Sequence, residues 1–526
     1  MSSSLPSENS AQGSDSRIAT SAEILRSEIP PGPVDARLPI LGRFLSQVSA
    51  LMGLLRFKPF DTSTEQGRSK ERYRRAVLTT CTSVLARCVT VVSGLITVRL
   101  TVRYLGTERN GLWMTITSVV AMMSFADFGI GNGLLNSISE AYGRDDRESV
   151  RKYVSSAFFV LLGIATILAV LFAIVYPLVP WPRFFNVSTP LAAREAGPAV
   201  IVFLACFALN MPLDVVQRVQ TGYQEGFETN LWGVAGSLTG FGCLLMAMHF
   251  KAGLPCLILA LSGGPLLGVL GNWGCEFAWV RPWLLPRWSF WDAAAARKIL
   301  GTGSMFLLIQ ACGIFAVAID NVIITQILGL DAVTQYAVPM RMFILVRSVA
   351  SMFVMPLWPA YGEAIARGDV KWVKRTVTRS IGFSLLVFGP PALGFALFGK
   401  TSVHAWVGPQ IQPSHLFLGG AALWVISDLC GNALGTFLCG ANLLGFQVVL
   451  YVIAAVVVLP AKLFGAKAFG LGGVVWVTAL VNVLGLVAIA VYVSRVLTKM
   501  EKEHAKLRPR AAETSLALDP AGELGP

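Results

Sequence analysis

Arginines inside apolar sequence are the residues of this chain that most require a chemical explanation. Arg87 and Arg99 lie in the stretch "LARCVTVVSGLITVRLTVRYLG" (residues 85–106), and Arg341 and Arg347 lie in a later apolar stretch. A charge at the centre of a membrane helix costs about 2.5–3.5 kcal/mol on insertion scales. A guanidinium keeps its charge and donates hydrogen bonds in pairs, which suits phosphate. The four arginines therefore predict a binding site for an anionic ligand that carries phosphate.

Arg87 and Arg347 lie near the middle of their stretches, where a side chain does not easily reach either membrane interface. One interpretation is that both line a water-filled cavity and hold the phosphates of the ligand. The other is that they form buried structural ion pairs, with Asp320 or Asp127 as the partner.

Arg99, Arg103 and Arg341 lie nearer the ends of their stretches. Arg99 and Arg103 share a helical face because they are four residues apart. They either line the cavity or use their long side chains to lift the charges to the outer headgroups. Arg341 has the same two interpretations. Asp214 and Arg218, also four residues apart, are expected to neutralise each other.

Acidic residues at membrane depth are candidates for ion coupling or gating. Asp320, followed by Asn321, is either an ion-coupling carboxylate, protonated in one state and paired with Arg347 in another, or part of a permanent salt bridge. Asp127 lies in "FADFGIGNG" (residues 125–133), where three glycines in five residues weaken a helix. That segment is either a hinge at an inner gate or a place of close helix packing.

The elements that must position these residues are membrane helices. Of the 526 residues, 54% are hydrophobic and 14% are charged, and the mean hydropathy is +0.63. A soluble protein would be nearly twice as charged. Apolar runs of about 20 residues recur, each long enough to cross a bilayer core of about 30 Å. The expected fold class is an all-α integral membrane protein with about twelve transmembrane helices.

The expected spans are residues 77–103, 111–135, 153–177, 198–220, 231–250, 254–280, 301–329, 335–359, 376–399, 415–440, 446–464 and 470–496. With the N-terminus in the cytoplasm, most Lys and Arg fall in inside loops, so both termini are predicted to be cytoplasmic. The net charge of +13 comes largely from the Lys and Arg of these inside loops. Nucleic acid is therefore not an expected partner. The nine cysteines show no CxxC spacing, which gives no support to a metal site or a disulfide framework.

The two halves of the chain resemble each other at a constant offset. "YLG" (residues 104–106) matches "ILG" (residues 327–329), and "EAYGRDDRESVRKYV" from Glu140 matches "EAIARGDVKWVKRTV" from Glu363, both 223 residues later. Six spans in each half give the halves the same orientation, which predicts a parallel repeat of two six-helix bundles with a site between them. The alternative is a chance likeness of short basic loops.

These patterns divide the chain into four segments. Residues 1–75 are expected to form a cytoplasmic, largely disordered extension. Residues 76–280 and 299–497 are the two bundles, and residues 498–526 are a basic cytoplasmic tail. Residues 41–55 place apolar side chains on one helical face, which predicts an amphipathic helix either on the inner leaflet or capping the protein itself.

The stretch "VRYLGTERNGLWMTITSVVAMMSFADFGIGNGLLNSISEAYGRDDRESVRKYVSSAF" resembles bacterial flippases for lipid-linked oligosaccharides. These are the O-antigen and exopolysaccharide exporters of the polysaccharide transporter family, in the multidrug/oligosaccharidyl-lipid/polysaccharide (MATE-like) superfamily. The elements "YLG", "DFGIGN" and "GRDD" carry the resemblance, which extends over residues 76–497. The N-terminal extension departs from the pattern of the family.

The resemblance implies two bundles around a cavity that opens alternately to either side of the bacterial inner membrane. It implies that the protein flips an undecaprenyl-diphosphate-linked oligosaccharide from the cytoplasmic to the periplasmic leaflet for surface polysaccharide biosynthesis. Besides this cargo and the lipid bilayer, a polysaccharide polymerase and glycosyltransferases of the same pathway are expected partners. No cofactor is expected, and the energy source is left open between a proton and a sodium gradient.

Three other classes of function fit the residues less well. An enzyme needs acids or histidines on a sizeable loop, whereas the four histidines belong to no such constellation and no nucleotide-binding motif is present. A cation-coupled multidrug or toxin-extrusion antiporter, the alternative function, needs an acidic cavity, yet arginines are at least as numerous as acids within the expected spans. A non-transporting scaffold has no need of mid-membrane arginines.

Overall fold

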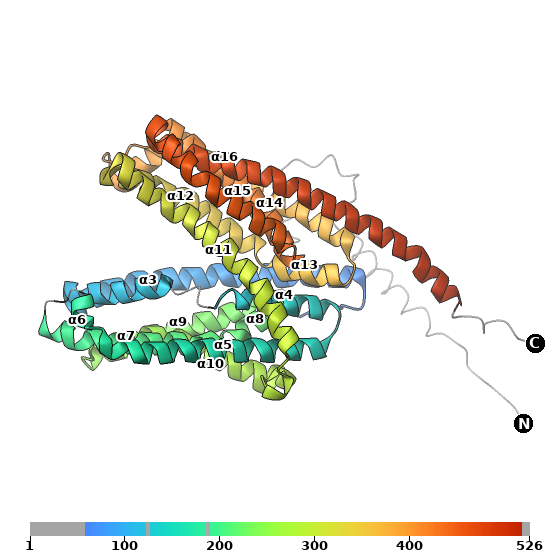
Figure 1. Ribbon diagram of the computed structural model, residues 1–526, viewed down its shortest axis with the longest axis horizontal. Helices are drawn as coiled ribbons and strands as arrows, with labels where there is room; N and C mark the ends of the chain where they lie inside the picture. Colours follow the sequence, from blue (N-terminus) through green and yellow to red (C-terminus); the bar gives the residue numbers. More distant parts are fainter. Residues whose placement is uncertain (1–57, 123–126, 186, 188, 518–526) are drawn as a thin grey trace, which may run out of the picture. The chain divides into compact units, whose positions relative to one another are not determined.

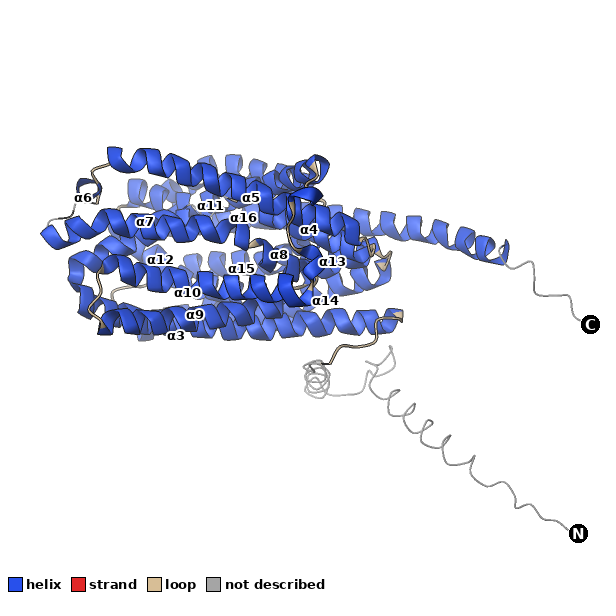
Figure 2. Cartoon of the chain, turned by 90° about the horizontal axis from the view of Figure 1, so that it is seen from below, coloured by secondary structure: helices blue, strands red, loops and turns tan. Residues whose placement is uncertain are grey.

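The structure is a computed structural model, and it describes residues 58–122, 127–185, 187 and 189–517. The regular elements in these ranges are all helices (Figure 2). The chain divides into a short unit, residues 1–77, and a large unit, residues 78–526. The predicted amphipathic helix, residues 41–55, lies outside the described residues.

In the short unit, a charged cluster forms on the first turns of α3 (Glu65–Met122). Glu71 is buried, and its carboxylate accepts hydrogen bonds from Arg74 at 2.6 Å, from Arg75 at 2.9 Å and from the backbone N–H of Phe60 at 3.0 Å. Spacings of three and four residues bring these side chains together on one helical face. The cluster fixes the chain where it enters the helix.

The large unit consists of long helices joined by short turns (Figure 1). After α3, its first half contains α4 (Ile130–Gly143), α5 (Arg147–Val175), η2 (Tyr176–Leu178), α6 (Trp181–Phe184), α7 (Pro190–Leu213), α8 (Val215–Gly222), α9 (Gly226–His249) and α10 (Leu254–Cys275). A connection follows with a π-helical turn, η3 (Glu276–Val280), and two 3-10 turns, η4 (Pro282–Leu284) and η5 (Trp288–Phe290). The second half contains α11 (Ala293–Leu328), α12 (Leu330–Val354), α13 (Leu357–Ala366), α14 (Val370–Val407), α15 (His415–Gly440) and α16 (Leu444–Ala517).

The membrane class of the fold is confirmed, because 10 of the described helices are long and apolar enough to cross a bilayer. One of them, Leu444–Glu503, is divided by the non-helical backbone of Gly470, and its two parts match the expected spans 446–464 and 470–496. The expected span 111–135 contains four residues outside the described part of the chain. A total of twelve spans and the cytoplasmic side of both termini therefore stay predictions.

The internal repeat is visible in the backbone turns. Gly106 and Gly329 have nearly the same non-helical conformation, with φ 76°, ψ 176° and φ 90°, ψ 169°. Asp145 and Gly368 both have positive φ, 55° and 77°. Each pair has the offset found in the sequence, and so do the ends of α4 and α13 and the starts of α5 and α14. Turn conformations that agree at one offset support a duplicated fold.

Each half has its own apolar core. In the first half, buried side chains of α4, α5 and α8 pack around Leu134 and Ile138. In the second half, α11, α12, α14, α15 and α16 pack around Phe343 and Phe417. A smaller apolar cluster joins the halves, with Leu135 of α4 packed against Phe306, Trp358 and Leu444 of the second half. Each bundle therefore has its own core, and apolar contacts also connect the two.

Paired glycines bring the last two helical segments of each half together. A Cβ on Gly264 of α10 would lie 2.1 Å from the Cα of Gly240 on α9. A Cβ on Gly473 would lie 2.0 Å from the carbonyl oxygen of Gly465, on the other side of the kink in α16. These backbones approach so closely that no side chain fits between them, a packing mode common in membranes.

The two halves meet through α4, α11 and α13. α4 packs against both α11 and α13, and the three helices come together in Figure 1. The first turns of α11 lie against α4, where Gly303 contacts Gly129, whereas α11 also packs along α16 in the second half. α11 is therefore the helix that carries the chain from one bundle into the other.

Candidate functional site

Polar contacts hold the halves together near α4 and α13. Arg367, directly after α13, donates two hydrogen bonds to Asp145 at 3.0 Å each, one to the carbonyl of Tyr142 at 3.3 Å and one to Glu363 at 2.7 Å. The hydrogen bonds to Asp145 raise the pKa of Arg367 above its usual value, against the opposing effect of burial. Gln224, after α8, donates to Glu363 at 3.0 Å. The loop after α4 in the first repeat and the loop after α13 in the second repeat are thus joined by hydrogen bonds.

A second set of contacts between the halves centres on Asn136 of α4, which is buried. Its nitrogen donates to the carbonyl of Cys439 at 2.8 Å and to Asn442 at 3.3 Å, and its oxygen accepts from the indole of Trp358 at 2.6 Å. Asn442, after α15, and Gln224, after α8, both have positive φ. Each half therefore extends a polar turn residue to the other half.

All four arginines predicted to bind the ligand have exposed side chains. Arg87 and Arg99 lie on α3, and Arg341 and Arg347 lie on α12. Arg347 donates through Nε to Asp428 at 2.7 Å, yet its side chain is still 49% exposed. The other three arginines form no ion pair or hydrogen bond with the described residues. Guanidinium donors therefore remain available to a ligand.

Arg87 and Arg347 lie at a similar depth on the two halves. The hydroxyl of Thr80 on α3 donates to the carbonyl of Met352 on α12 at 3.2 Å, which places the helices side by side at this point. α3 runs away from the contact and α12 runs toward it (Figure 1). At 1.5 Å per residue, Arg87 then lies about 10 Å and Arg347 about 8 Å beyond the contact. By the same measure, Arg341 lies about 17 Å and Arg99 about 28 Å beyond the contact.

Asp320 has partners that the sequence analysis did not expect. Its side chain is buried and forms a salt bridge with Lys462 of α16, which is fully buried. The hydroxyl of Tyr336 donates to the second carboxylate oxygen at 2.6 Å. This buried cluster links α11, α12 and α16 inside the second half. Arg347 pairs with Asp428 rather than with Asp320, and an ion-coupling role for Asp320 stays a prediction.

Asn321 and Asp127, the other predicted coupling or gating residues, do not join this cluster. The side chain of Asn321 is exposed on α11. The carboxylate of Asp127 accepts from the N–H of Gly129 at 3.0 Å, just before α4 begins. Phe128 and Gly129 have positive φ, and a Cβ on Gly129 would lie 2.2 Å from the carbonyl of Gly303. The segment therefore turns the chain and packs closely against α11, as the packing interpretation expects, whereas a hinge at an inner gate stays a prediction.

Sequence reasoning missed two charges of the site. Lys462 stands alone in "VVVLPAKLFG" (residues 456–465), and a lysine inside an expected span was the signal that could have found it. Asp428, on α15, is the ion-pair partner of Arg347. The pair of Asp214 and Arg218 is confirmed at 3.3 Å. Spacing along one helix predicts such a pair, whereas it says nothing about partners on distant helices.

The fold and site together define a helical membrane protein built from two repeats, with polar contacts that join the repeats at one end and exposed arginines beyond that end. The solved structure of a MATE transporter in the bent conformation has the same fold, with a TM-score of 0.67 over 84% of this chain and 100% of that one, at 14% identity.

The family of polysaccharide biosynthesis proteins matches residues 79–364, and this chain belongs to that family. A Salmonella typhi protein assigned to O-antigen transport is 22% identical over 58% of this chain and 68% of its own length. A Yersinia pseudotuberculosis protein assigned to O-antigen export is 20% identical over 54% of this chain and 64% of its own length. The predicted family is confirmed, and the chain is a multi-pass transporter of the bacterial inner membrane.

Proposed function

We propose that this protein flips an undecaprenyl-diphosphate-linked oligosaccharide from the cytoplasmic to the periplasmic leaflet of the inner membrane, for surface polysaccharide biosynthesis. The family, and relatives assigned to O-antigen transport and export, support such a cargo. The observation that carries the proposal is the pair of exposed arginines at a similar depth on the two halves, Arg87 and Arg347. A polymerase and glycosyltransferases of the same pathway are the proposed partners.

The two arginines compensate the diphosphate as it leaves water. Each guanidinium offers paired, charge-assisted hydrogen bonds to phosphate oxygens. A hydrogen bond to a charged group contributes about 1.5–3 kcal/mol net, so the loss of one arginine weakens binding roughly ten- to hundredfold. Arg341 and Arg99 continue the positive charge toward the opposite end, along the route of the headgroup. Asp428 holds one donor of Arg347 and leaves the others to the cargo.

The polar contacts of Arg367 and Asn136 form the inner gate in this proposal. The loops that carry Arg367 and Asp145 are rich in Lys and Arg, which supports a cytoplasmic location. The described state is then closed to the cytoplasm. Opening requires these contacts to break, and the turn at Asp127 and Gly129, where α4 begins against α11, is the proposed hinge.

Ion coupling is assigned to Asp320 and Lys462. A buried carboxylate held by a lysine and a tyrosine takes up a proton or sodium only when the lysine moves away. The proposal is therefore that α11 and α16 shift relative to each other during the cycle, driven by a proton or sodium gradient. Transport by Asp320→Asn that still depends on the gradient would exclude this assignment.

A cation-coupled multidrug antiporter is the second candidate, favoured by the fold shared with MATE transporters. Such a pump binds lipophilic cations, which exposed arginines repel. Three of the four candidate arginines lack an acidic partner among the described residues. The charge of the site therefore favours the anionic cargo.

Mass spectrometry of lipid-linked oligosaccharides after depletion of the protein tests the choice. Cells are rescued with wild type, Arg87→Ala, Arg347→Ala or Arg183→Ala, the last being an exposed arginine on α6 outside the expected spans. The proposal predicts that a diphosphate-linked oligosaccharide accumulates and that only wild type and Arg183→Ala clear it. If drug sensitivity rises and no such lipid accumulates, the cargo is a small cation.

A further inference from the structure

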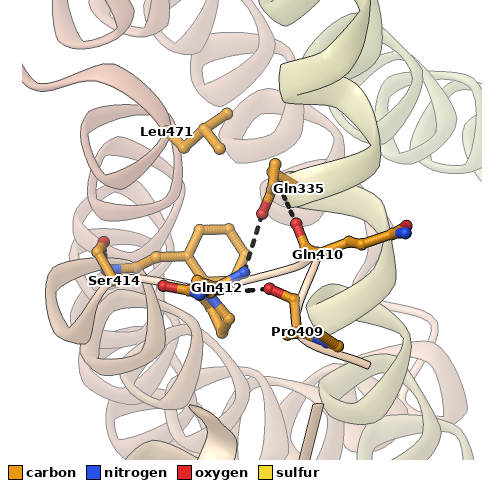
Figure 3. Close-up of a pocket in the computed structure, with 8 residues that line it drawn as sticks. Gln335, Pro409, Gln410, Gln412, Ser414 and Leu471 are labelled. Atoms are coloured by element: carbon orange, nitrogen blue, oxygen red, sulfur yellow. Dashed lines mark hydrogen bonds between the residues drawn. The ribbon is translucent and has the colours of Figure 1, made fainter. Parts of the chain in front are cut away.

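A cavity of about 410 Å³ lies in the second half, between α12 and the loop that joins α14 to α15 (Figure 3). The residues that line it are Gln335 on α12, five loop residues (Pro409, Gln410, Gln412, Pro413 and Ser414), Phe417 and Leu471. The volume falls in the range of small-ligand sites. The topology predicted from the basic loops places this end in the periplasm. A ligand that has crossed the membrane would therefore meet this cavity.

Gln335 holds the loop in a defined conformation. Its side-chain nitrogen donates to the carbonyl of Gln410 at 2.8 Å, and its side-chain oxygen accepts from the N–H of Gln412 at 3.1 Å (Figure 3). The side-chain nitrogen of Gln412 reaches the carbonyl of Pro409 at 3.3 Å, and Ser414 caps α15. These hydrogen bonds fix the cavity walls.

The lining combines polar and apolar side chains and carries no charge, because it consists of Gln, Pro, Ser, Phe and Leu side chains. The amide of Gln410 and the side-chain oxygen of Gln412 have no hydrogen-bond partner among the described residues, and both side chains are exposed. An amide presents a donor and an acceptor in one plane, which matches two neighbouring hydroxyl groups. Pro409 and Leu471 add apolar surface, which suits the C–H face of a sugar ring.

We infer that this cavity is a carbohydrate subsite, which holds uncharged sugar residues of the cargo on the periplasmic side. The inference rests on the proposed function and adds a second attachment point to it, remote from the arginines. Gln335 is twelve residues before Arg347 on α12, so the subsite lies about 18 Å from that arginine along the helix. Sugars distal to the diphosphate reach it, and the first sugar does not.

Reconstituted transport with two cargoes tests the subsite. One lipid diphosphate carries a single sugar and the other carries the complete oligosaccharide. The double variant Gln410→Ala with Gln412→Ala is compared with wild type and with Gln326→Ala, an exposed glutamine on α11 outside the cavity. Loss of two neutral hydrogen-bonding groups predicts roughly three- to tenfold slower transport of the complete oligosaccharide, with single-sugar transport unchanged. Leu471→Trp, which fills the cavity, is expected to have the same selective effect.

The outcomes separate the subsite from the proposed function. If wild type transports neither cargo, the proposed function fails. If wild type transports both, and the cavity variants transport both as wild type does or slow both equally, the cavity is not a glycan site. Saturation-transfer NMR with the lipid-free oligosaccharide gives a second readout, because contact with the sugar must disappear in the double variant and persist in Gln326→Ala.

Discussion

The two halves of the molecule have matching turn conformations, but they bury different polar side chains at equivalent positions. In the first half, Thr97, Thr101 and Asn110 are buried, and the hydroxyl of Thr101 bonds the amide oxygen of Asn110 at 3.2 Å. In the second half, Asp320 stands 223 residues after Thr97, the offset of the matched turns, and is buried with a lysine and a tyrosine. One fold thus accommodates a neutral polar cluster in one copy and an ion pair in the other.

This difference shows that the repeated fold does not require a buried charge at the position of Asp320. A buried ion pair is weak support for stability, because desolvation of two charges offsets much of their attraction. The first half reaches the same arrangement of helices with hydroxyl and amide groups. The pair of Asp320 and Lys462 therefore points to the transport cycle rather than to folding, which supports its assignment to coupling.

Removing one partner of the ion pair is expected to have the largest effect. Lys462→Met leaves the carboxylate of Asp320 buried without its cation, which costs about 3–5 kcal/mol. The double variant Lys462→Met with Asp320→Thr removes both charges, places a threonine at position 320 as at position 97, and is expected to recover most of that loss. Thermal unfolding of the purified variants measures both. If the single variant is as stable as wild type, the comparison of the halves loses its energetic basis.

The second largest effect is expected from replacing an arginine by lysine in either half, which compares how much Arg87 and Arg347 each contribute to flipping. Lysine keeps the charge but loses the planar fork. Arg87→Lys is expected to slow flipping about tenfold, since loss of one charge-assisted hydrogen bond is worth about 1.5–3 kcal/mol. Arg347→Lys is expected to have a smaller effect, because Asp428 already occupies one of its donors. The reverse order in a reconstituted flipping assay would show that Arg347 is the principal ligand.

The glycine contacts are expected to respond alike in both halves. Gly264→Ala and Gly473→Ala each place a methyl group against a neighbouring backbone, which costs about 1–3 kcal/mol by overpacking. Gly242→Ala on α9, where nothing lies within 4 Å of the new Cβ, is the matched control. Unfolding temperatures of the three variants provide the test. A loss confined to one half would mean that the repeats are not packed equivalently.

The smallest effect concerns the cap of α5. Asp146 accepts hydrogen bonds from the hydroxyl and the N–H of Ser149, and these hydrogen bonds lower the pKa of Asp146. The equivalent residue of the second repeat is Asp369, whose side chain does not cap α14. Asp146→Ala is expected to cost about 1 kcal/mol. Because the folded-state pKa is lowered, the contribution is complete above the usual pKa and is lost as the pH falls through the lowered value.

Unfolding of wild type and Asp146→Ala across pH checks this prediction. The stability difference should be constant near neutral pH and shrink only below about pH 4. A difference that changes between pH 6 and 8 would have to come from another group.

Local patterns predicted the features that depend on neighbours in the chain. The helical class, most of the spans, the repeat offset and the pair of Asp214 and Arg218 all follow from hydropathy and from spacing along one helix. Hydropathy is a property of each segment by itself, because the bilayer imposes the same requirement on every spanning helix. The break at Asp127 was likewise marked by its glycines.

Only the tertiary structure decided which charges meet. Asp320 forms an ion pair with Lys462 rather than with Arg347, which pairs with Asp428. Arg367 of the second half pairs with Asp145 of the first half. These partners lie 81 to 222 residues apart in sequence, so their pairing depends on how whole helices pack and not on any local period. The sequence by itself determined that charges lie in the membrane. Packing determined which of them are neutralised inside a bundle and which stay exposed for a ligand.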